Sequence, residues 1–234
     1  MAVVENFFET REQLFAALTD FCAAKLNAAT AQGQASFMVS GGSSPAPVYE
    51  ALSKADLAWD KIQVALVDER WVEPGHDKSN QSLLERTLIQ NNAANASFTA
   101  MKNSGAVAAD GLAECEADYQ KLAQPLTLTM LGMGPDGHTA SLFPHAKGLA
   151  EALSTDALCA AITANESEVT GAFVERMTLT ASALNAPEEL VLLITGDDKL
   201  EALRAAQAEG AVEDMPIRAV LNRENTPLQV FWAP

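Results

Sequence analysis

The most constraining feature of the sequence is a regular alternation of short, almost continuous apolar runs with longer segments whose apolar residues recur every three to four positions. The short runs are typical of strands buried on both faces, and the longer spacing is typical of amphipathic helices. Their alternation predicts an α/β fold: a Rossmann-like parallel sheet with helices on both faces. Because no internal repeat or low-complexity linker interrupts the pattern, one domain is expected over residues 1–234.

The predicted elements follow directly from this pattern. Helices are expected at about 10–31, 45–53, 105–122 and 196–207, and in a segment that follows Ser79. Strands are expected at the apolar runs SFMVS (36–40), IQVALV (62–67), LTLTML (126–131), ALCAAI (157–162), ELVLLIT (189–195), PIRAVLN (216–222) and LQVFWA (228–233). Thr10 stands three residues before Gln13, which is a capping box for the first helix. Ligands bind outside the carboxyl ends of parallel strands, so the loops after residues 40, 67 and 131 are the expected site.

Charge and composition restrict the partners of such a protein. With 31 acidic and 15 basic residues the formal net charge is −16, and a field of this sign repels nucleic acid and anionic membranes, so neither is expected as a partner. No apolar run approaches the roughly 18 to 20 residues of a membrane span, and the first residues lack the pattern of a secretory signal. The three cysteines are widely separated, without the spacing of a disulfide framework. We therefore expect a cytoplasmic protein; the sequence does not define its oligomeric state, and a monomer is favoured.

The loop SGGSSP (40–45) has the composition of an anion-binding turn. Gly41 and Gly42 allow the backbone to approach a ligand closely. Ser43 and Ser44 supply hydroxyls, and Pro45 suits the first turn of a helix, whose N–H groups lack partners within the helix. The alternative is an ordinary glycine-rich turn with a serine N-cap. The loop is neither a P-loop, because the lysine of that motif is absent, nor a serine-hydrolase elbow, because Pro45 stands where that motif needs glycine.

Three basic residues are candidates for binding an anionic substrate. Arg70 follows a buried strand in VDERWV, and its planar guanidinium suits a phosphate or carboxylate. Arg176 opens RMTLT, and Lys199 lies in the first turn after the strand that ends ITG. For each of the three the alternative is an ordinary solvated charge, and position alone singles out Arg176 and Lys199.

The glycines of LGMGPDGHTASLFP (131–144) suggest a dinucleotide cradle at first. Gly132, Gly134 and Gly137 have the G-x-G-x-x-G spacing of that motif and follow a predicted strand. The motif requires a helix after its third glycine, but Pro144 allows at most a short helical turn. No nucleotide cofactor is therefore expected.

The favoured interpretation of the same stretch is a loop that presents Asp136 and His138 at the edge of the sheet. Histidine is the side chain best suited to moving a proton near neutral pH, and a nearby carboxylate can fix its tautomer. His76 and His145 do not form a close ligand set with His138, so no metal is expected.

Taken in order, these motifs resemble the 6-phosphogluconolactonase family. The resemblance is carried over nearly the whole chain by SGGSSP, VDERWV, LGMGPDGHTASLFP, RMTLT, ITGDDK and LQVFWAP. It implies the fold that this family shares with glucosamine-6-phosphate deaminases and ribose-5-phosphate isomerases, a Rossmann-like α/β domain without a nucleotide. The implied activity is hydrolysis of 6-phospho-D-glucono-1,5-lactone to 6-phosphogluconate in the oxidative pentose phosphate pathway, with this sugar-phosphate lactone as the small-molecule partner.

The resemblance also implies roles for particular residues. His138 is expected to be the general base that activates water, with Asp136 as its neighbour. The turn 41–44, Arg176 and Lys199 are expected to hold the phosphate, and Arg70 is expected to lie beside the substrate. A lactone carbonyl is already electrophilic, so one base and a few N–H or cationic groups suffice, without a metal, a cofactor or a covalent intermediate.

Two positions favour a lactonase over the sister family of deaminases, which shares the glycine–histidine loop. A deaminase has a glutamate five residues after the histidine, where this sequence has Phe143. The deaminase loop D-E-Y has tyrosine where this sequence has Arg70, although Asp68 occupies the place of the deaminase's catalytic aspartate. Three alternatives to a lactonase stay open: a deaminase, a sugar-phosphate sensor without turnover, and a serine esterase that uses Ser43.

Overall fold

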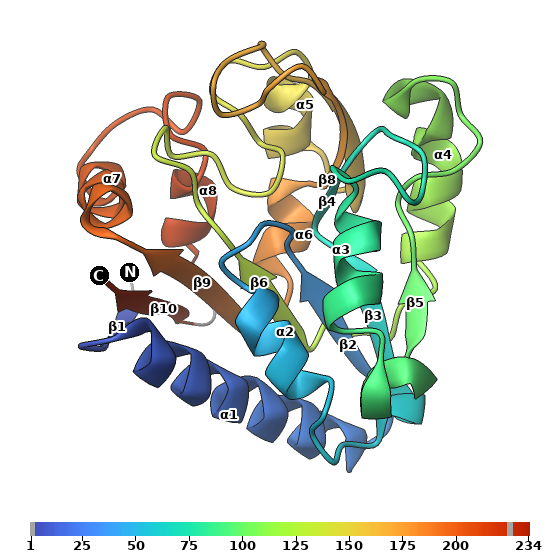
Figure 1. Ribbon diagram of the computed structural model, residues 1–234. Coiled ribbons are helices and arrows are strands. Elements are labelled where there is room, and N and C mark those ends of the chain that lie inside the picture. The colour runs from blue at the N-terminus through green and yellow to red at the C-terminus, as the bar shows by residue number, and fades with distance from the viewer. Residues whose placement is uncertain (1–2, 224–226) are drawn as a thin grey trace.

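Seven parallel strands form the main sheet of the protein, in a computed structural model that describes residues 3–223 and 227–234 (Figure 1). In spatial order they are β1 (Val3–Phe7), β10 (Leu228–Ala233), β9 (Glu189–Thr195), β6 (Leu128–Leu131), β2 (Ala35–Val39), β3 (Ile62–Leu66) and β5 (Ser97–Thr99). Every neighbouring pair runs parallel, which confirms the predicted sheet. The sequence pattern did not predict β1 and β5, because these edge strands are partly exposed and lack a continuous apolar run.

A second sheet contains three antiparallel strands in the order β4 (Asp68–Arg70), β8 (Glu175–Leu179) and β7 (Cys159–Thr163). Two expectations are wrong here: residues 68–70 form a strand rather than a loop, and the run ALCAAI contributes β7 to this sheet rather than to the parallel one. Val67 joins the two sheets, because its N–H donates to the carbonyl of Val39 (2.9 Å) while its own carbonyl accepts from the N–H of Leu179 (2.8 Å). The chain therefore leaves the main sheet at Val67 and carries β4 past the end of β3.

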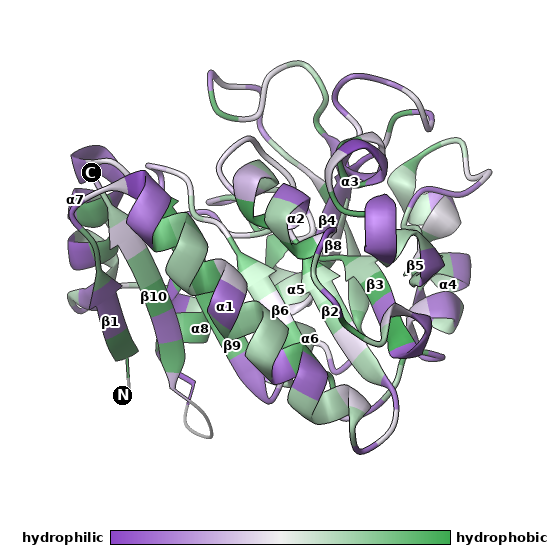
Figure 2. Ribbon diagram, turned by 60° about the horizontal axis from the view of Figure 1, so that its bottom comes forward, coloured by the Kyte–Doolittle hydropathy of each residue, from purple (hydrophilic) through white to green (hydrophobic). Residues whose placement is uncertain are grey.

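Helices cover both faces of the main sheet. Figure 2 shows α1, α2 and α3 in front of the strands and α5, α6 and α8 behind them. The α-helices are α1 (Arg11–Thr30), α2 (Ala46–Leu52), α3 (Asn80–Thr87), α4 (Ala108–Tyr119), α5 (Leu149–Ser154), α6 (Ala181–Asn185), α7 (Asp197–Gln207) and α8 (Arg218–Leu221), with short 3-10 helices at Trp59–Lys61 and Asn91–Asn95. In the part of the chain that the structure describes, no helix combines the length and the apolar character needed to cross a membrane.

Local capping signals set where two of these helices begin. Thr10 caps α1, and its side chain accepts a hydrogen bond from the N–H of Gln13 (3.3 Å), as the capping box predicts. Ser79 caps α3 in the same way by accepting from the N–H of Ser82 (3.2 Å). Both caps satisfy first-turn N–H groups that have no partner inside a helix.

The expectation of a strand at PIRAVLN (216–222) is wrong, because this run contains helix α8. A short apolar run does not distinguish a strand from a buried helix. The buried side chain of Arg218 contributes long-range contacts here, since its guanidinium donates to the backbone carbonyls of Ala205, Ala206 and Ala211. These bonds fasten α8 to the end of α7 and to the segment that follows it.

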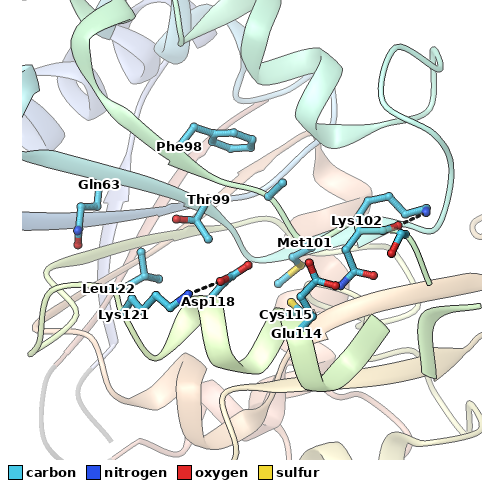
Figure 3. Close-up of a pocket in the computed structure, with 13 residues that line it drawn as sticks. Gln63, Phe98, Thr99, Met101, Lys102, Glu114, Cys115, Asp118, Lys121 and Leu122 are labelled. Carbon is cyan, nitrogen blue, oxygen red and sulfur yellow. Dashed lines mark hydrogen bonds and ion pairs between the residues drawn. The ribbon is translucent and has the colours of Figure 1, made fainter. Parts of the chain in front are cut away.

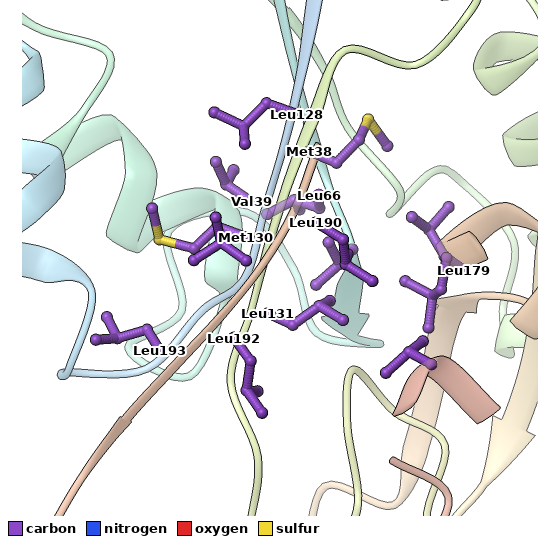
Figure 4. Packing of buried hydrophobic residues seen from close by; sticks show 14 of the residues in the cluster. Met38, Val39, Leu66, Leu128, Met130, Leu131, Leu179, Leu190, Leu192 and Leu193 are labelled. Atoms are coloured by element: carbon purple, nitrogen blue, oxygen red, sulfur yellow. The ribbon is translucent and has the colours of Figure 1, made fainter. Parts of the chain in front are cut away.

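The core is built on the central strands of the main sheet. Every residue of β2 and β6 is buried, as expected for strands covered on both faces. Figure 4 shows leucine, methionine and valine side chains of β2, β3, β6 and β9 packed on either side of the backbone. Burial of one such side chain contributes about 1.5–3 kcal/mol. The loops at the carboxyl ends of these strands therefore begin from rigid positions.

Candidate active site

The predicted site residues line or adjoin one cavity of about 310 Å³ at the carboxyl ends of the main-sheet strands. Its wall contains the turn 41–44 after β2, Arg70 of β4, His138 after β6, Arg176 of β8 and Lys199 of α7. These are all of the residues that the sequence predicted to bind substrate, together with the predicted base. The remaining predicted residue, Asp136, reaches the cavity through its contact with His138.

All four residues of the turn 41–44 line the cavity. Gly41 packs against Asn80 so closely that a β-carbon would lie 1.9 Å from Asn80 Oδ1, so a larger residue does not fit. Asn80 is held in turn by its Nδ2, which donates to the carbonyl of Asp68 (2.8 Å). Helix α2 has Pro45 at its N-cap and no side-chain cap, so the alternative of a serine N-cap does not hold.

Two arginines face the cavity from paired strands. In the register of β4 and β8, Arg70 lies directly opposite Arg176. Within residues 3–223 and 227–234, no carboxylate forms an ion pair with either guanidinium, and the buried Nε of Arg70 has no hydrogen-bond partner there. Like charges opposite each other on paired strands are destabilising. The arrangement therefore suits an anionic ligand that lies against both side chains.

Hydrogen bonds to the backbone hold both arginines in place. Arg176 Nε donates to the carbonyl of Phe173 (2.7 Å) and its Nη2 donates to that of Thr170 (3.0 Å). Arg70 Nη1 donates to the carbonyl of Lys78 (2.6 Å). Burial lowers the pKa of Arg176 to about 10, which leaves it charged at neutral pH. Because Arg176 is only 3% exposed, the alternative of a solvated surface charge does not hold for it.

His138 and Asp136 form a hydrogen-bonded pair. Nδ1 of His138 lies 2.6 Å from Oδ1 of Asp136, and the same oxygen accepts from the backbone N–H of His138 (3.1 Å). Because the carboxylate engages Nδ1, Nε2 is the ring nitrogen available for proton transfer. Burial acts to raise the pKa of Asp136, but the hydrogen bonds and charge of His138 outweigh it, so this pKa lies below its usual value.

Glycine at position 134 allows the close approach of this pair. A β-carbon on Gly134 would lie 2.2 Å from His138 Nδ1 and 2.6 Å from Asp136 Oδ1. The N–H of Gly134 donates to the carbonyl of His138 (3.0 Å), which closes the turn. Residues 138–148 contain no helix, so the helix that a dinucleotide cradle requires does not follow these glycines.

The two acids that precede Arg70 in the chain, Asp68 and Glu69, have different surroundings. Asp68 lines the cavity, and its Oδ2 accepts a hydrogen bond from Ser141 Oγ (2.6 Å). The Glu69 carboxylate instead accepts four hydrogen bonds of 2.7–2.9 Å, from the N–H groups of Arg70, Asn80 and Gln81 and the hydroxyl of Ser79. Glu69 therefore anchors the start of α3, and only Asp68 is available to a ligand.

Sequence reasoning missed two polar residues that organise the cavity, Asn80 and Ser141. Asn80 lies at the start of α3 and has no recognisable motif of its own. Ser141 lies inside the stretch 131–144, but its partner Asp68 is distant in the chain. Phe143, which also lines the cavity, was identified only as a departure from the deaminase pattern.

A second, larger cavity lies beside the edge strand β5 (Figure 3). It measures about 510 Å³, and none of the predicted site residues line it. Its basic side chains are already paired: Lys121 with Asp118 at 2.7 Å, and Lys102 with Glu73 at 3.3 Å. The smaller cavity therefore remains the candidate active site.

The chain is similar to known proteins in both sequence and structure. It matches the family model described as glucosamine-6-phosphate isomerases/6-phosphogluconolactonase over residues 9–232. It is 42% identical to the 6-phosphogluconolactonase of Rhizobium meliloti (strain 1021), and the match covers 100% of both chains. A crystal structure of a 6-phosphogluconolactonase from Shewanella baltica OS155 superposes with a TM-score of 0.94 at 38% identity, covering 99% of this chain and 98% of that one.

A monomeric glucosamine-6-phosphate deaminase shares the fold, with a TM-score of 0.82 at 16% identity over 99% of this chain and 97% of that one. At this identity the likeness concerns the fold alone. The resemblance deduced from the sequence motifs is confirmed by the family match and by the full-length relatives. The chain therefore belongs to the family of glucosamine-6-phosphate isomerases and 6-phosphogluconolactonases.

Proposed function

We propose that the protein hydrolyses 6-phospho-D-glucono-1,5-lactone to 6-phospho-D-gluconate in the oxidative pentose phosphate pathway. The observation that carries this proposal is the position of His138, paired with Asp136, in the same cavity as the opposed Arg70 and Arg176. Hydrolysis of a phosphorylated lactone requires a base to activate water and a binding site for the anionic phosphate. The full-length relative from Rhizobium meliloti, at 42% identity, bears the name of this activity.

In this proposal Nε2 of His138 takes a proton from a water molecule while the water oxygen attacks C1 of the lactone. Charge collects on the carbonyl oxygen, and then the bond between C1 and the ring oxygen breaks. The leaving ring oxygen takes the proton back from the imidazolium, which restores the base. Asp136 keeps the proton of the resting ring on Nδ1 and stabilises the imidazolium.

The phosphate lies at the other end of the cavity in this proposal. Arg176, Lys199 and the turn 41–44 hold it, and Arg70 lies beside the substrate, opposite Arg176. Charge-assisted hydrogen bonds to phosphate are stronger than neutral ones. Binding at a group remote from C1 positions the carbonyl relative to His138, which lowers the entropic cost of the reaction.

The direct test is the rate at which freshly prepared 6-phosphogluconolactone disappears, compared with its spontaneous hydrolysis. Purified protein is expected to accelerate the loss, and His138→Ala is expected to lower kcat by about 10²–10⁴-fold, the usual contribution of a general base. The exposed His145 provides the matched control, since it faces Asp214 outside the cavity and His145→Ala should retain activity. Absence of acceleration by the unaltered protein would overturn the proposal.

Further measurements separate the alternatives. A deaminase would release ammonia from glucosamine 6-phosphate, and none is expected. A sensor would bind 6-phosphogluconate without turning over the lactone. A serine esterase would lose all turnover in Ser43→Ala, whereas the proposed mechanism expects a change confined mainly to KM.

We also propose that the chain acts as a single domain, as a monomer and in the cytoplasm; gel filtration of the purified protein tests its oligomeric state.

A further inference from the structure

The ring of Phe143 contacts both ends of the proposed reaction site. Its centroid lies 4.5 Å from that of the His138 ring, with 36° between the two planes. The central guanidinium carbon of Arg176 lies 5.3 Å from the same centroid. Phe143 is 5% exposed and lines the cavity. One neutral side chain thus contacts the proposed base and a proposed phosphate ligand.

The backbone around Phe143 is fixed from the second sheet. The N–H of Ser141 donates to Thr178 Oγ1 of β8 (3.1 Å), and Ser141 Oγ donates to Asp68 Oδ2 of β4 (2.6 Å). The carbonyl of Phe143 accepts from the N–H of Ala146 (3.2 Å). The ring is therefore supported by the same two strands that carry Arg70 and Arg176.

An aromatic ring offers two properties at this position. Its face attracts cations, and Phe143 lies beside one permanent cation, Arg176, and beside His138, which is a cation in the proposed mechanism while it holds the proton taken from water. A phenyl ring also adds no charge of its own. The imidazole of His138 thus has two different neighbours: the carboxylate of Asp136, which is hydrogen-bonded to it, and the uncharged ring of Phe143, which packs against it.

We propose that Phe143 is a positioning residue for lactone hydrolysis: its ring holds the imidazole of His138 against Asp136 and sets the distance between the base and Arg176. This inference rests on the proposed function. It predicts two measurable effects of replacing the ring: a joint change in turnover and substrate binding, and a change in the pH profile when the replacement carries a charge.

The first test replaces the ring by an aliphatic side chain. Phe143→Leu is expected to lower kcat/KM by about tenfold, with changes in both kcat and KM, and Phe143→Tyr is expected to restore most of the activity. Phe231→Leu is the matched control, because Phe231 is also buried (4% exposed) and packed against two other aromatic rings but does not line the cavity. Both leucine variants should lose similar thermal stability, while only Phe143→Leu loses activity.

The second test concerns charge. Phe143→Glu and Phe143→Gln have nearly the same shape, but only glutamate places a carboxylate beside the imidazole. A carboxylate favours the imidazolium, which is inactive as a base, so the acid limb of the profile of kcat/KM against pH should move to higher pH in the glutamate variant relative to the glutamine variant. The pH at which the acid limb lies does not change when a variant merely loses stability.

The outcomes separate this inference from the proposed function. If the unaltered protein does not hydrolyse the lactone, the proposed function fails. If it does, but Phe143→Leu keeps the wild-type kcat and KM, or loses activity only in proportion to Phe231→Leu, the positioning role of Phe143 is wrong. Coincident pH profiles of the glutamate and glutamine variants would also overturn it.

Discussion

Arg70 and Arg176 stand directly opposite each other on β4 and β8, and both line the same cavity as His138. Two cations at neighbouring positions repel each other, and a bound dianion such as a phosphate group relieves that repulsion. The Asp68 carboxylate offsets part of this repulsion in the free protein, and the proposed function places the negative charge of the substrate beside both arginines.

The first prediction concerns this pair. Arg70→Ala and Arg176→Ala are each expected to raise KM for the lactone by about tenfold or more, because each removes a charged donor beside the anionic substrate, worth about 1.5–3 kcal/mol. 6-Phosphogluconate is expected to raise the Tm of the unaltered protein, since ligand binding stabilises the folded state, and this rise should shrink in both variants. Arg86→Ala, an exposed position on α3, is the control. An unchanged KM in both cavity variants would contradict the phosphate assignment.

The second prediction concerns the orientation of the base. Asp136→Asn preserves the shape of the side chain but removes the negative charge beside Nδ1 of His138. The amide can then donate to Nδ1, which places the ring proton on Nε2, where it blocks proton abstraction. We expect kcat to fall by about 10²-fold with little change in KM, measured by steady-state kinetics. A variant whose kcat stays within about twofold of wild type would show that Asp136 does not orient the base.

A third prediction follows from the lowered pKa of Asp136. A carboxyl with a lower pKa in the folded state than in the unfolded state contributes stability above its unfolded pKa of about 3.9, and this contribution is lost as the pH falls through the folded value. Asp136→Asn cannot titrate. The difference in free energy of unfolding between wild type and this variant, measured by urea unfolding, should therefore be largest above about pH 5 and shrink below about pH 4. A difference that does not vary with pH would contradict the assigned shift.

The fourth prediction concerns Gly134. A methyl group there would overlap Nδ1 of His138 and Oδ1 of Asp136, so Gly134→Ala must displace the pair. We expect kcat to fall by about tenfold or more, because small displacements of a catalytic group are costly. Gly33→Ala is the control, since a β-carbon there meets no atom within 4 Å. Equal activity of the two variants would mean that the base tolerates displacement.

The sequence predicts the strands that are buried on both faces of the sheet. Strands β2, β3, β6, β9 and β10 appear in the sequence as apolar runs because they are buried on both faces or nearly so. Edge strands β1 and β5 are partly exposed and leave no such run. The segment PIRAVLN was predicted wrongly, because a short apolar run does not distinguish a strand from a buried helix, and the long-range bonds of Arg218 to residues on and just after α7 leave no local signal.

The sequence by itself determined the alternation of buried strands and helices and excluded the dinucleotide interpretation, and it proposed His138 as the base, because each of these depends on residues close together in the chain. Glycine spacing, Pro144 and the pairing of Asp136 with His138 are local features of this kind. Only the tertiary structure placed Arg70 opposite Arg176 and Phe143 against both His138 and Arg176. These contacts depend on the pairing of β4 with β8, which begins where the backbone of Val67 bonds to both sheets, and no local pattern encodes such long-range pairing.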